Sequence, residues 1–236
     1  MKTNTVEQHF AKYSGQYYKN VHMSLRLLYQ NIGVSISEQL KGSVLDIGNG
    51  GVFFYNTEPL EKITAVDIAY PHQMMNTEKI SFITGDARDL HFLADETYDC
   101  ILMQFLLHHI VESTRQQTED VLLSIFQESF RLLKRGGKIV IIESIVNSFV
   151  EVWENLFYTF HASILHALNR PMVKFYSLKS LTELLKRSRF AEVQIQKIPI
   201  GNKWIPLAPA LFPGILKVPP YLFPTRFYRI VSTKPE

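Results

Sequence analysis

The chain has only one cysteine, Cys100, among its 236 residues. A single cysteine cannot form an intrachain disulfide, a redox pair or a cysteine-based zinc site. We therefore expect a protein of a reducing compartment, the cytoplasm. Hydrophobic residues make up 46% of the sequence. At this length that content favours one sizeable core, and hence a single domain with elaborations.

Long apolar runs and clustered basic residues are also missing. The first nine residues are polar, and no apolar stretch reaches the roughly 20 residues that span a bilayer. We expect no integral membrane segment, and contact with a membrane surface stays open. The 25 basic and 22 acidic residues are spread along the chain, giving a net charge of +3. Nucleic-acid binding usually needs a basic stripe, so we expect no nucleic-acid partner.

Short runs of β-branched or aromatic residues alternate with helical segments, which predicts a parallel sheet wound with helices. The expected strands are 43–47, 63–67, 80–84, 98–103, 138–143, 192–198 and 226–232. Helical periodicity is clearest over 119–134, where Gly136 and Gly137 are expected to stop the helix. The segment 179–189 shows the same periodicity.

A glycine-rich turn, DIGNGG at 46–51, follows the first expected strand. Glycines there let the backbone approach a ligand and present amide N–H groups to it. Such a turn also occurs in dinucleotide folds, but their Gly-x-Gly-x-x-Gly pattern fails because Phe53 stands three residues beyond Gly50. The carboxylate of Asp46, two residues before Gly48, also counts against NAD. An NAD-dependent oxidoreductase is therefore a lesser alternative.

Five motifs in register over 43–143 resemble the class I S-adenosylmethionine-dependent methyltransferases, especially the small-molecule group that includes quinone-biosynthesis enzymes. They are DIGNGG at 46–51, VD at 66–67, GDA at 85–87, YD at 98–99 followed by LHHI at 107–110, and LLKRGGK at 132–138. The resemblance implies an α/β, Rossmann-like methyltransferase fold: a doubly wound, mostly parallel, seven-stranded sheet. It also implies methyl transfer from S-adenosyl-L-methionine to an oxygen, carbon or nitrogen atom of a small acceptor.

The resemblance places the cofactor at the carboxyl ends of the first three strands. Asp67 lies where a carboxylate can accept two hydrogen bonds from a ribose diol. Asp86 would accept from the adenine amine, while the backbone N–H of Ala87 reaches a ring nitrogen. The full expected cofactor set is Asp46, Gly48, Asn49, Gly50, Asp67, Ile68, Asp86, Ala87 and Gln104.

The glycine turn has its own implied roles and one departure from the family. Gly48 and Gly50 would pass beneath the methionine part of the cofactor, and Asp46 would order the loop and help to hold the amino-acid end. The family usually repeats glycine as Gly-x-Gly-x-Gly, whereas Val52 stands where the third glycine would fall. The departure keeps open a second function, a cofactor-binding protein with a non-methylating role.

Methyl transfer mostly requires alignment of the acceptor and exclusion of water. A general base is needed only for a hydroxyl or carbon-acid acceptor, and His109, His161 and Tyr17 are the candidates. The adjacent His108 and His109, with Glu112 nearby, also suggest a metal site. Adjacent helical residues point in different directions, however, so we expect no metal.

Two apolar stretches exceed a minimal βαβ repeat, and we interpret them as covers over the active site. They are a helical lid at 147–176 and a flap at 199–224 with seven of the eleven prolines. A helical cap at 1–42 would complete one domain over 1–236. The flap would lie on the lid, on a lipophilic acceptor or on a membrane, or would only close a core. We therefore expect a small, apolar acceptor.

The aromatic residues and histidines of the cap, and those of the lid, can each be interpreted in two ways. The cap residues either fold across the site or pack a surface helix onto the core, and the lid residues either line the acceptor pocket or belong to the core. These residues are Tyr13, Tyr17, Tyr18 and His22 in the cap, and Trp153, Tyr158, His161 and Tyr176 in the lid.

Overall fold

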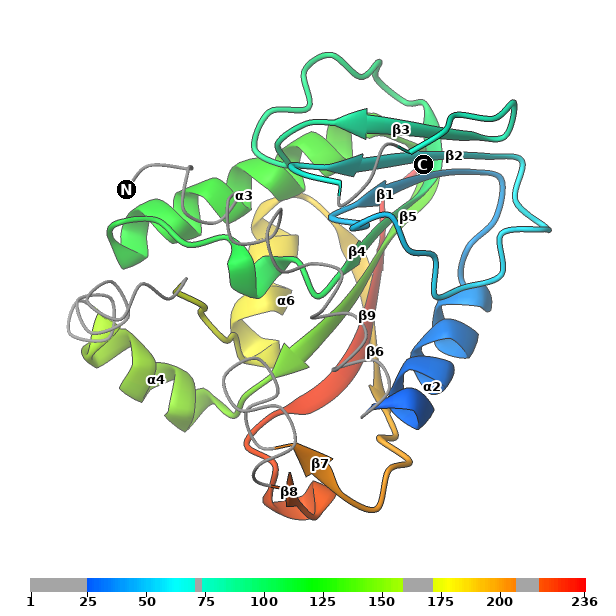
Figure 1. The fold of residues 1–236 in the computed structure, drawn as a ribbon. Coiled ribbons are helices and arrows are strands. Elements are labelled where there is room, and N and C mark those ends of the chain that lie inside the picture. The colour runs from blue at the N-terminus through cyan, green and yellow to red at the C-terminus, as the bar shows by residue number, and fades with distance from the viewer. Residues whose placement is uncertain (1–24, 71–73, 159–171, 207–216) are drawn as a thin grey trace.

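The computed structural model describes residues 25–70, 74–158, 172–206 and 217–236. Seven strands form one sheet with helices on both sides (Figure 1). The strands are β1 (Ser43–Ile47), β2 (Lys62–Asp67), β3 (Ile80–Thr84), β4 (Tyr98–Gln104), β5 (Leu133–Ile145), β6 (Ala191–Ile198) and β9 (Arg226–Thr233). The helices are α2 (Arg26–Ser37), α3 (Arg115–Leu132), α4 (Ser148–Leu156) and α6 (Leu178–Arg187), with short 3-10 turns η1 (Leu107–His109) and η2 (Pro220–Leu222). A small hairpin pairs β7 (Ile205–Pro206) with β8 (Lys217–Val218).

The strand order of the large sheet is β3-β2-β1-β4-β5-β9-β6. Strands β1 to β5 pair in parallel, and β9 runs antiparallel to both β5 and β6. The predicted seven-stranded, mostly parallel α/β fold is thereby confirmed. Because β1, β2 and β3 are parallel neighbours, their carboxyl ends meet at one edge of the sheet.

One expected boundary was wrong. Helix α3 ends at Leu132 and β5 begins at Leu133, so Gly136 and Gly137 lie inside the strand and do not stop the helix. Leu133 pairs with Tyr98, and the register then shifts before the next pair. The intervening residues form a bulge that Gly136, with a φ of 69°, allows.

The connections between β1 and β4 also differ from the predicted alternation. In the described residues the segments 48–61, 68–79 and 85–97 contain turns and bends in place of helices. Two clusters of buried side chains nevertheless pack the two faces of the sheet. Helices α3 and α6 cover one face and α2 covers the other (Figure 1).

The described ends of the expected flap pack on the side of α2. The buried residues Ile200, Ile205 and Phe223 belong to the same core cluster as α2. The side chain of Asn31 in α2 also donates to the backbone oxygen of Pro199 at 2.8 Å. Both ends of the segment therefore close a core against α2, while 207–216 lies outside the described residues.

Candidate functional site

The turn after β1 needs glycine for its backbone shape. Gly48 and Gly50 have φ values of 77° and 63°, which residues with a β-carbon rarely adopt. A β-carbon on Gly48 would also lie 2.9 Å from a methyl group of Leu106. The N–H of Gly48 donates to the oxygen of Val66 at 2.8 Å, which holds the turn against β2.

Asp46 anchors this turn from below. Its side chain is buried, and one carboxylate oxygen accepts from the amide of Asn49 at 2.6 Å and from the hydroxyl of Tyr55 at 2.9 Å. Burial raises the pKa of Asp46 to about 7. Asn49 in turn accepts from the N–H of Gly51 at 2.9 Å. The carboxylate of Asp46 and the amide of Asn49 together hold the loop through these hydrogen bonds.

Asp67 lies opposite the turn, at the end of β2. One carboxylate oxygen accepts from the N–H of Gly50 at 2.8 Å, and the other accepts from the N–H of Ala69 at 3.1 Å. Burial raises the pKa of Asp67. Each carboxylate oxygen keeps a second lone pair, so the group can still accept hydrogen bonds from a diol.

Tyr70 supplies a polar atom that needs a partner. Its hydroxyl is buried and has no hydrogen-bond partner among the described residues. The ring packs edge-on against Phe82, and a ring carbon lies 3.5 Å from the position of a β-carbon on Gly51. Burial, followed by the charges of Asp67 and Asp46, raises the pKa of Tyr70. A buried donor without a partner beside a carboxylate suits a ligand that carries hydroxyl groups, so these residues fit the ribose of the implied cofactor.

Asp86 lies at the end of β3, but its carboxylate is already occupied. The guanidinium of Arg88 binds both of its oxygens, with Nε 2.9 Å from each, and also donates to Glu112 at 2.9 Å. Burial alone would raise the pKa of Asp86, but the hydrogen bonds from Arg88 outweigh burial and lower it. The adjacent Ala87 is buried.

A histidine and a glutamate meet at the carboxyl ends of β4 and β5. Nδ1 of His108 lies 2.7 Å from the carboxylate of Glu143, which is fully buried. The same carboxylate accepts from the backbone N–H groups of Leu107 at 3.1 Å and Ser144 at 2.7 Å. The ring of His108 also stacks on Phe175, with centroids 5.7 Å apart. In the neutral ring, an N–H on Nδ1 that donates to this carboxylate leaves Nε2 as an acceptor.

The remaining residues predicted for the site make no contact with Asp67 or the glycine turn that is described above, or lie outside the described residues. His109 lies next to His108, with ring centroids 4.0 Å apart, and Gln104 ends β4. Ile68 directly follows Asp67. Tyr17 and His161, with Tyr13, Tyr18 and His22, lie outside the described residues. Over the described ranges, no three His, Cys, Asp or Glu side chains gather to hold a metal ion.

The lid aromatics fall into two groups. Trp153 is half exposed on α4 and stacks on Phe157, with centroids 5.0 Å apart. Tyr158 is buried and donates to the backbone oxygen of Glu112 at 2.7 Å. Tyr176 is also buried.

Sequence reasoning missed Tyr70, Arg88 and the pair of His108 and Glu143. A signal for the pair exists, because Glu143 is an acid inside a strand that is otherwise apolar, IVIIESI at 139–145. A fully buried acid must have nearby donors. The contact of Arg88 with Asp86 joins residues only two positions apart, whereas its contact with Glu112, 24 residues away, has no local signal.

Comparisons with known proteins concern the fold and residues 45–141. Residues 45–141 match the family model described as a methyltransferase domain. No curated protein sequence matches the chain. The fold is similar to a Haloferax volcanii protein, described as a methyltransferase, that was solved with the methyltransferase activator Trm112. The two chains are 15% identical, with a TM-score of 0.62 and coverage of 95% of this chain and 96% of the other.

Two further solved structures have similar folds. One is the 1,6-didemethyltoxoflavin-N1-methyltransferase of Burkholderia thailandensis, which binds 1,6-didemethyltoxoflavin and S-adenosylhomocysteine in its crystal. It is 17% identical, with a TM-score of 0.60, and the match covers 99% of this chain and 88% of the other. The other is an S-adenosylmethionine-dependent methyltransferase from Thermotoga maritima, 19% identical with a TM-score of 0.58, at 97% and 99% coverage. The chain therefore has the class I methyltransferase fold. Residues 45–141 of this fold match the family model of a methyltransferase domain.

Proposed function

We propose that the protein transfers a methyl group from S-adenosylmethionine to a small acceptor. The observation that carries this proposal is the meeting of Asp67, the glycine turn and the unpartnered hydroxyl of Tyr70 at the carboxyl ends of β1 and β2. This edge is where α/β sheets bind nucleotides. The match of residues 45–141 to a methyltransferase domain supports the same assignment.

In this proposal each residue of the site has one task. Asp67 accepts hydrogen bonds from the ribose diol, and Tyr70 donates its free hydroxyl proton. The backbone at Gly48 and Gly50 passes beneath the amino-acid end, and Asp46 holds that backbone in place. The bound cofactor supplies an activated methyl group on a sulfonium, so the protein chiefly has to align the acceptor and exclude water.

For a hydroxyl or carbon-acid acceptor we propose His108, in place of His109, as the proton acceptor. Glu143 orients its ring, and the free Nε2 would take the proton as the acceptor is methylated. The buried carboxylate then stabilises the imidazolium that forms. His108→Asn preserves an N–H for Glu143 but removes Nε2, so we expect methyl transfer to fall about a hundredfold with cofactor binding kept. His91→Asn, at an exposed histidine, is the control.

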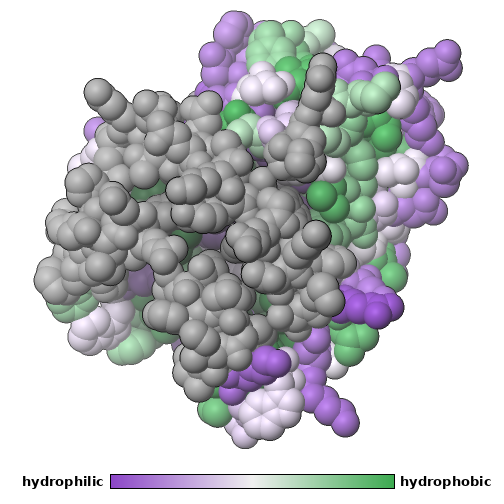
Figure 2. Space-filling view, viewed as in Figure 1, coloured by the Kyte–Doolittle hydropathy of each residue, from purple (hydrophilic) through white to green (hydrophobic). Residues whose placement is uncertain are grey.

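The surface of α4 favours an apolar acceptor, as in the quinone-biosynthesis enzymes that the sequence resembles. Hydrophobic surface appears over α4 at the lower left of Figure 2. The exposed side chains are Phe149, Val152, Trp153 and Leu156. Exposed apolar groups gathered on one helix mark a contact site for a protein, a membrane or a ligand, and we propose a lipophilic acceptor as the ligand here. No helix in the described ranges is both long and apolar enough to cross a bilayer.

Calorimetric titration with S-adenosylhomocysteine tests cofactor binding directly. Hydrogen bonds to a charged group contribute about 1.5–3 kcal/mol, so Asp67→Ala should weaken binding about ten- to a hundredfold. Asp89→Ala, at an exposed acid, is the matched control and should bind normally. Unchanged affinity of a folded Asp67→Ala variant would contradict the assignment of Asp67 to the ribose. Tighter binding of NAD than of S-adenosylhomocysteine would contradict the methyltransferase proposal.

The departure of the glycine turn, where Val52 replaces the third glycine of the family, favours a second candidate, cofactor binding without methyl transfer. The contact of Arg88 with both oxygens of Asp86 also means that adenine would need a different partner or a displaced Arg88. Release of S-adenosylhomocysteine from S-adenosylmethionine in the presence of lipophilic hydroxyl acceptors decides between the two. Product formation supports the methyltransferase, and tight binding without product over a broad acceptor panel supports the second candidate.

A further inference from the structure

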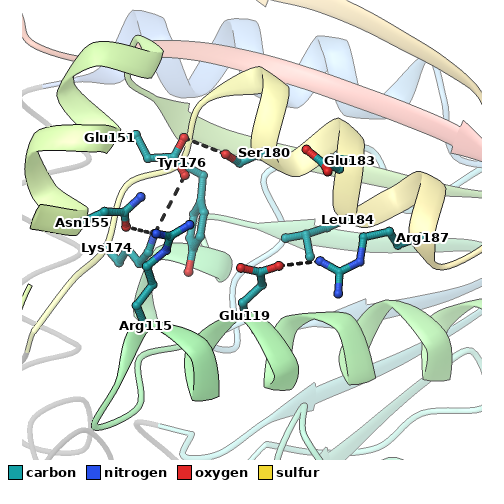
Figure 3. A pocket seen from close by; sticks show the side chains of 10 residues that line it. All are labelled: Arg115, Glu119, Glu151, Asn155, Lys174, Tyr176, Ser180, Glu183, Leu184 and Arg187. Carbon is teal, nitrogen blue, oxygen red and sulfur yellow. Dashed lines mark hydrogen bonds and ion pairs between the residues drawn. The ribbon is translucent and has the colours of Figure 1, made fainter.

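A cavity separate from the glycine turn lies where α4 meets α3 and α6. Its volume is about 180 Å³, which is below the 300–1,000 Å³ of drug-sized sites but ample for a small molecule. Figure 3 shows its walls, with α3 below, α6 above and α4 at the left. None of the proposed cofactor residues lines it. Its occupant is therefore distinct from the cofactor.

Two buried charges form the floor of the cavity. The ammonium of Lys174 is 6% exposed and donates to the side-chain oxygen of Asn155 at 3.0 Å. Glu151 is equally buried, and one of its oxygens accepts from the N–H of Ser177 at 3.1 Å and the hydroxyl of Ser180 at 2.7 Å. The other oxygen of Glu151 lies 3.9 Å from Lys174, too far for a hydrogen bond. Lys174 therefore keeps donor protons, and Glu151 keeps an acceptor oxygen, for a ligand on the floor of the cavity.

Tyr176 provides an independent sign of a missing ligand. It is 3% exposed, yet its hydroxyl has no hydrogen-bond partner among the described residues. Lys174 lies over its ring at 4.4 Å from the centroid, and the hydroxyl points toward α3 (Figure 3). A buried hydroxyl left without a partner costs about 1–3 kcal/mol. A ligand in the cavity that accepts this proton would recover that free energy.

The rim carries both signs of charge. Glu119 of α3 pairs with Arg187 of α6, whereas Arg115 and Glu183 have no ion pair in the described part of the chain. Across the lining, three basic residues face three acidic residues. A lone anion or a lone cation would therefore meet repulsion as well as attraction, but a molecule with both charges would not.

We propose that this cavity binds a small amino-acid-like zwitterion. Its carboxylate would accept from Tyr176, Lys174 and Arg115, and its ammonium would donate to the free oxygen of Glu151. The arrangement would complete every polar group on the floor. It would also link α4 and α3 to the segment that precedes α6, because Glu151 lies on α4, Arg115 lies on α3, and Lys174 and Tyr176 lie just before α6. The proposal does not depend on the methyltransferase assignment.

Ligand titration followed by calorimetry or ligand-observed NMR tests this site in the full chain. The probes are glycine, L-alanine and β-alanine. The controls are acetate and methylamine, which each carry a single charge, at equal ionic strength. We expect at least one zwitterion to bind at least tenfold more tightly than either control. Failure of all three zwitterions to exceed the controls would overturn the proposal.

Three variants locate the binding. Tyr176→Phe removes a buried hydroxyl that makes no hydrogen bond among the described residues, so the free protein should melt at or above the wild-type temperature while zwitterion affinity falls about tenfold. Lys174→Met should also weaken zwitterion binding, but its free protein should melt below the wild type, because the variant loses the hydrogen bond to Asn155 and the positive charge that faces buried Glu151. Glu151→Gln keeps an acceptor for Ser177 and Ser180, and should abolish the preference for a zwitterion over acetate.

Matched controls separate the site from general effects. Tyr221→Phe and Lys179→Met alter exposed residues outside the cavity and should bind as the wild type does. Every variant should keep its affinity for S-adenosylhomocysteine, so a failure of the cofactor proposal would be seen separately. Wild-type zwitterion affinity in a folded Tyr176→Phe variant would contradict the proposed site.

Discussion

Replacing Asp46 with asparagine should change how stability depends on pH. The carboxyl of Asp46 has its pKa raised by burial from an ordinary 3.8 to about 7. The folded state therefore holds the proton more tightly than the unfolded state does. Below about pH 4 the group is protonated in both states and costs nothing. As the pH rises from 4 to 7 the unfolded state releases its proton first, so stability is progressively lost, and above 7 the loss is constant.

The magnitude follows from the size of the pKa change. One pKa unit corresponds to about 1.4 kcal/mol, so a rise from 3.8 to about 7 corresponds to roughly 4 kcal/mol at pH 8. Asp46→Asn has no carboxyl to ionise, and its amide oxygen can still accept from Asn49 and Tyr55. The added amide donor is buried and costs about 1–3 kcal/mol, but that cost does not vary with pH.

The test therefore compares, at two pH values, the difference in stability between the variant and the wild type. Urea unfolding of both proteins at pH 4 and pH 8 gives the free energy of unfolding of the variant minus that of the wild type. We expect this quantity to rise by about 3–4 kcal/mol between the two pH values. Asp89→Asn, at an exposed acid, controls for the other carboxyl groups and should show no rise. A constant difference for Asp46→Asn would refute the raised pKa.

Three further substitutions probe the packing around the site, and each is read by urea unfolding. Gly33→Ala should cost about 1–3 kcal/mol, because a β-carbon would lie 2.0 Å from the backbone oxygen of Phe54. Wild-type stability of this variant would show that α2 and the loop that contains Phe54 can move apart at no cost. Glu143→Ala should cost about 3–5 kcal/mol, since it leaves two backbone N–H groups and a histidine unpaired, and a cost below 1 kcal/mol would contradict the buried network. Phe126→Ala should cost about 3–5 kcal/mol as a fully buried core residue, and a smaller loss would mean that the face under α3 repacks.

The strands of the sheet were the most predictable part of the fold. β1 and β3 have the predicted bounds, because short β-branched runs bounded by glycine or polar residues carry a local signal. The start of α3 was less predictable. Its first turn is polar and lacks apolar periodicity, so the prediction began at Glu119, four residues late. The N-cap Thr114, which accepts from Gln117, was the available signal.

The loop after β1 shows why local periodicity was not enough. The alternation of strands and helices predicted a helix there, but the segment forms turns, and Tyr55 points inward and donates to Asp46 beneath the glycine turn. Asp46 and Asp67 were predictable because each is fixed by a strand end and a neighbouring motif. The contact between His108 and Glu143 was not, because it joins residues 35 positions apart on different elements.

The buried ends of the flap decide where a deletion that tests it should begin and end. A deletion of 205–218 would remove Ile205, which is fully buried in the core cluster of α2. Loss of activity after that deletion would therefore mix a damaged core with a lost acceptor contact. Deletion of 207–216 alone spares Ile205 and the partly buried Val218, which packs against the same cluster. It is the sharper test of an acceptor-covering flap.

The position of β9 has a consequence for synthesis. β9 is the last strand of the large sheet along the chain, yet it lies between β5 and β6 and pairs with both. While the ribosome is still adding these residues, β6 has no partner in the sheet and β5 has an open edge. Open edges of this kind recruit strands from other chains. The nascent protein therefore passes through a stage in which aggregation competes with folding, and that stage ends only when β9 enters the gap.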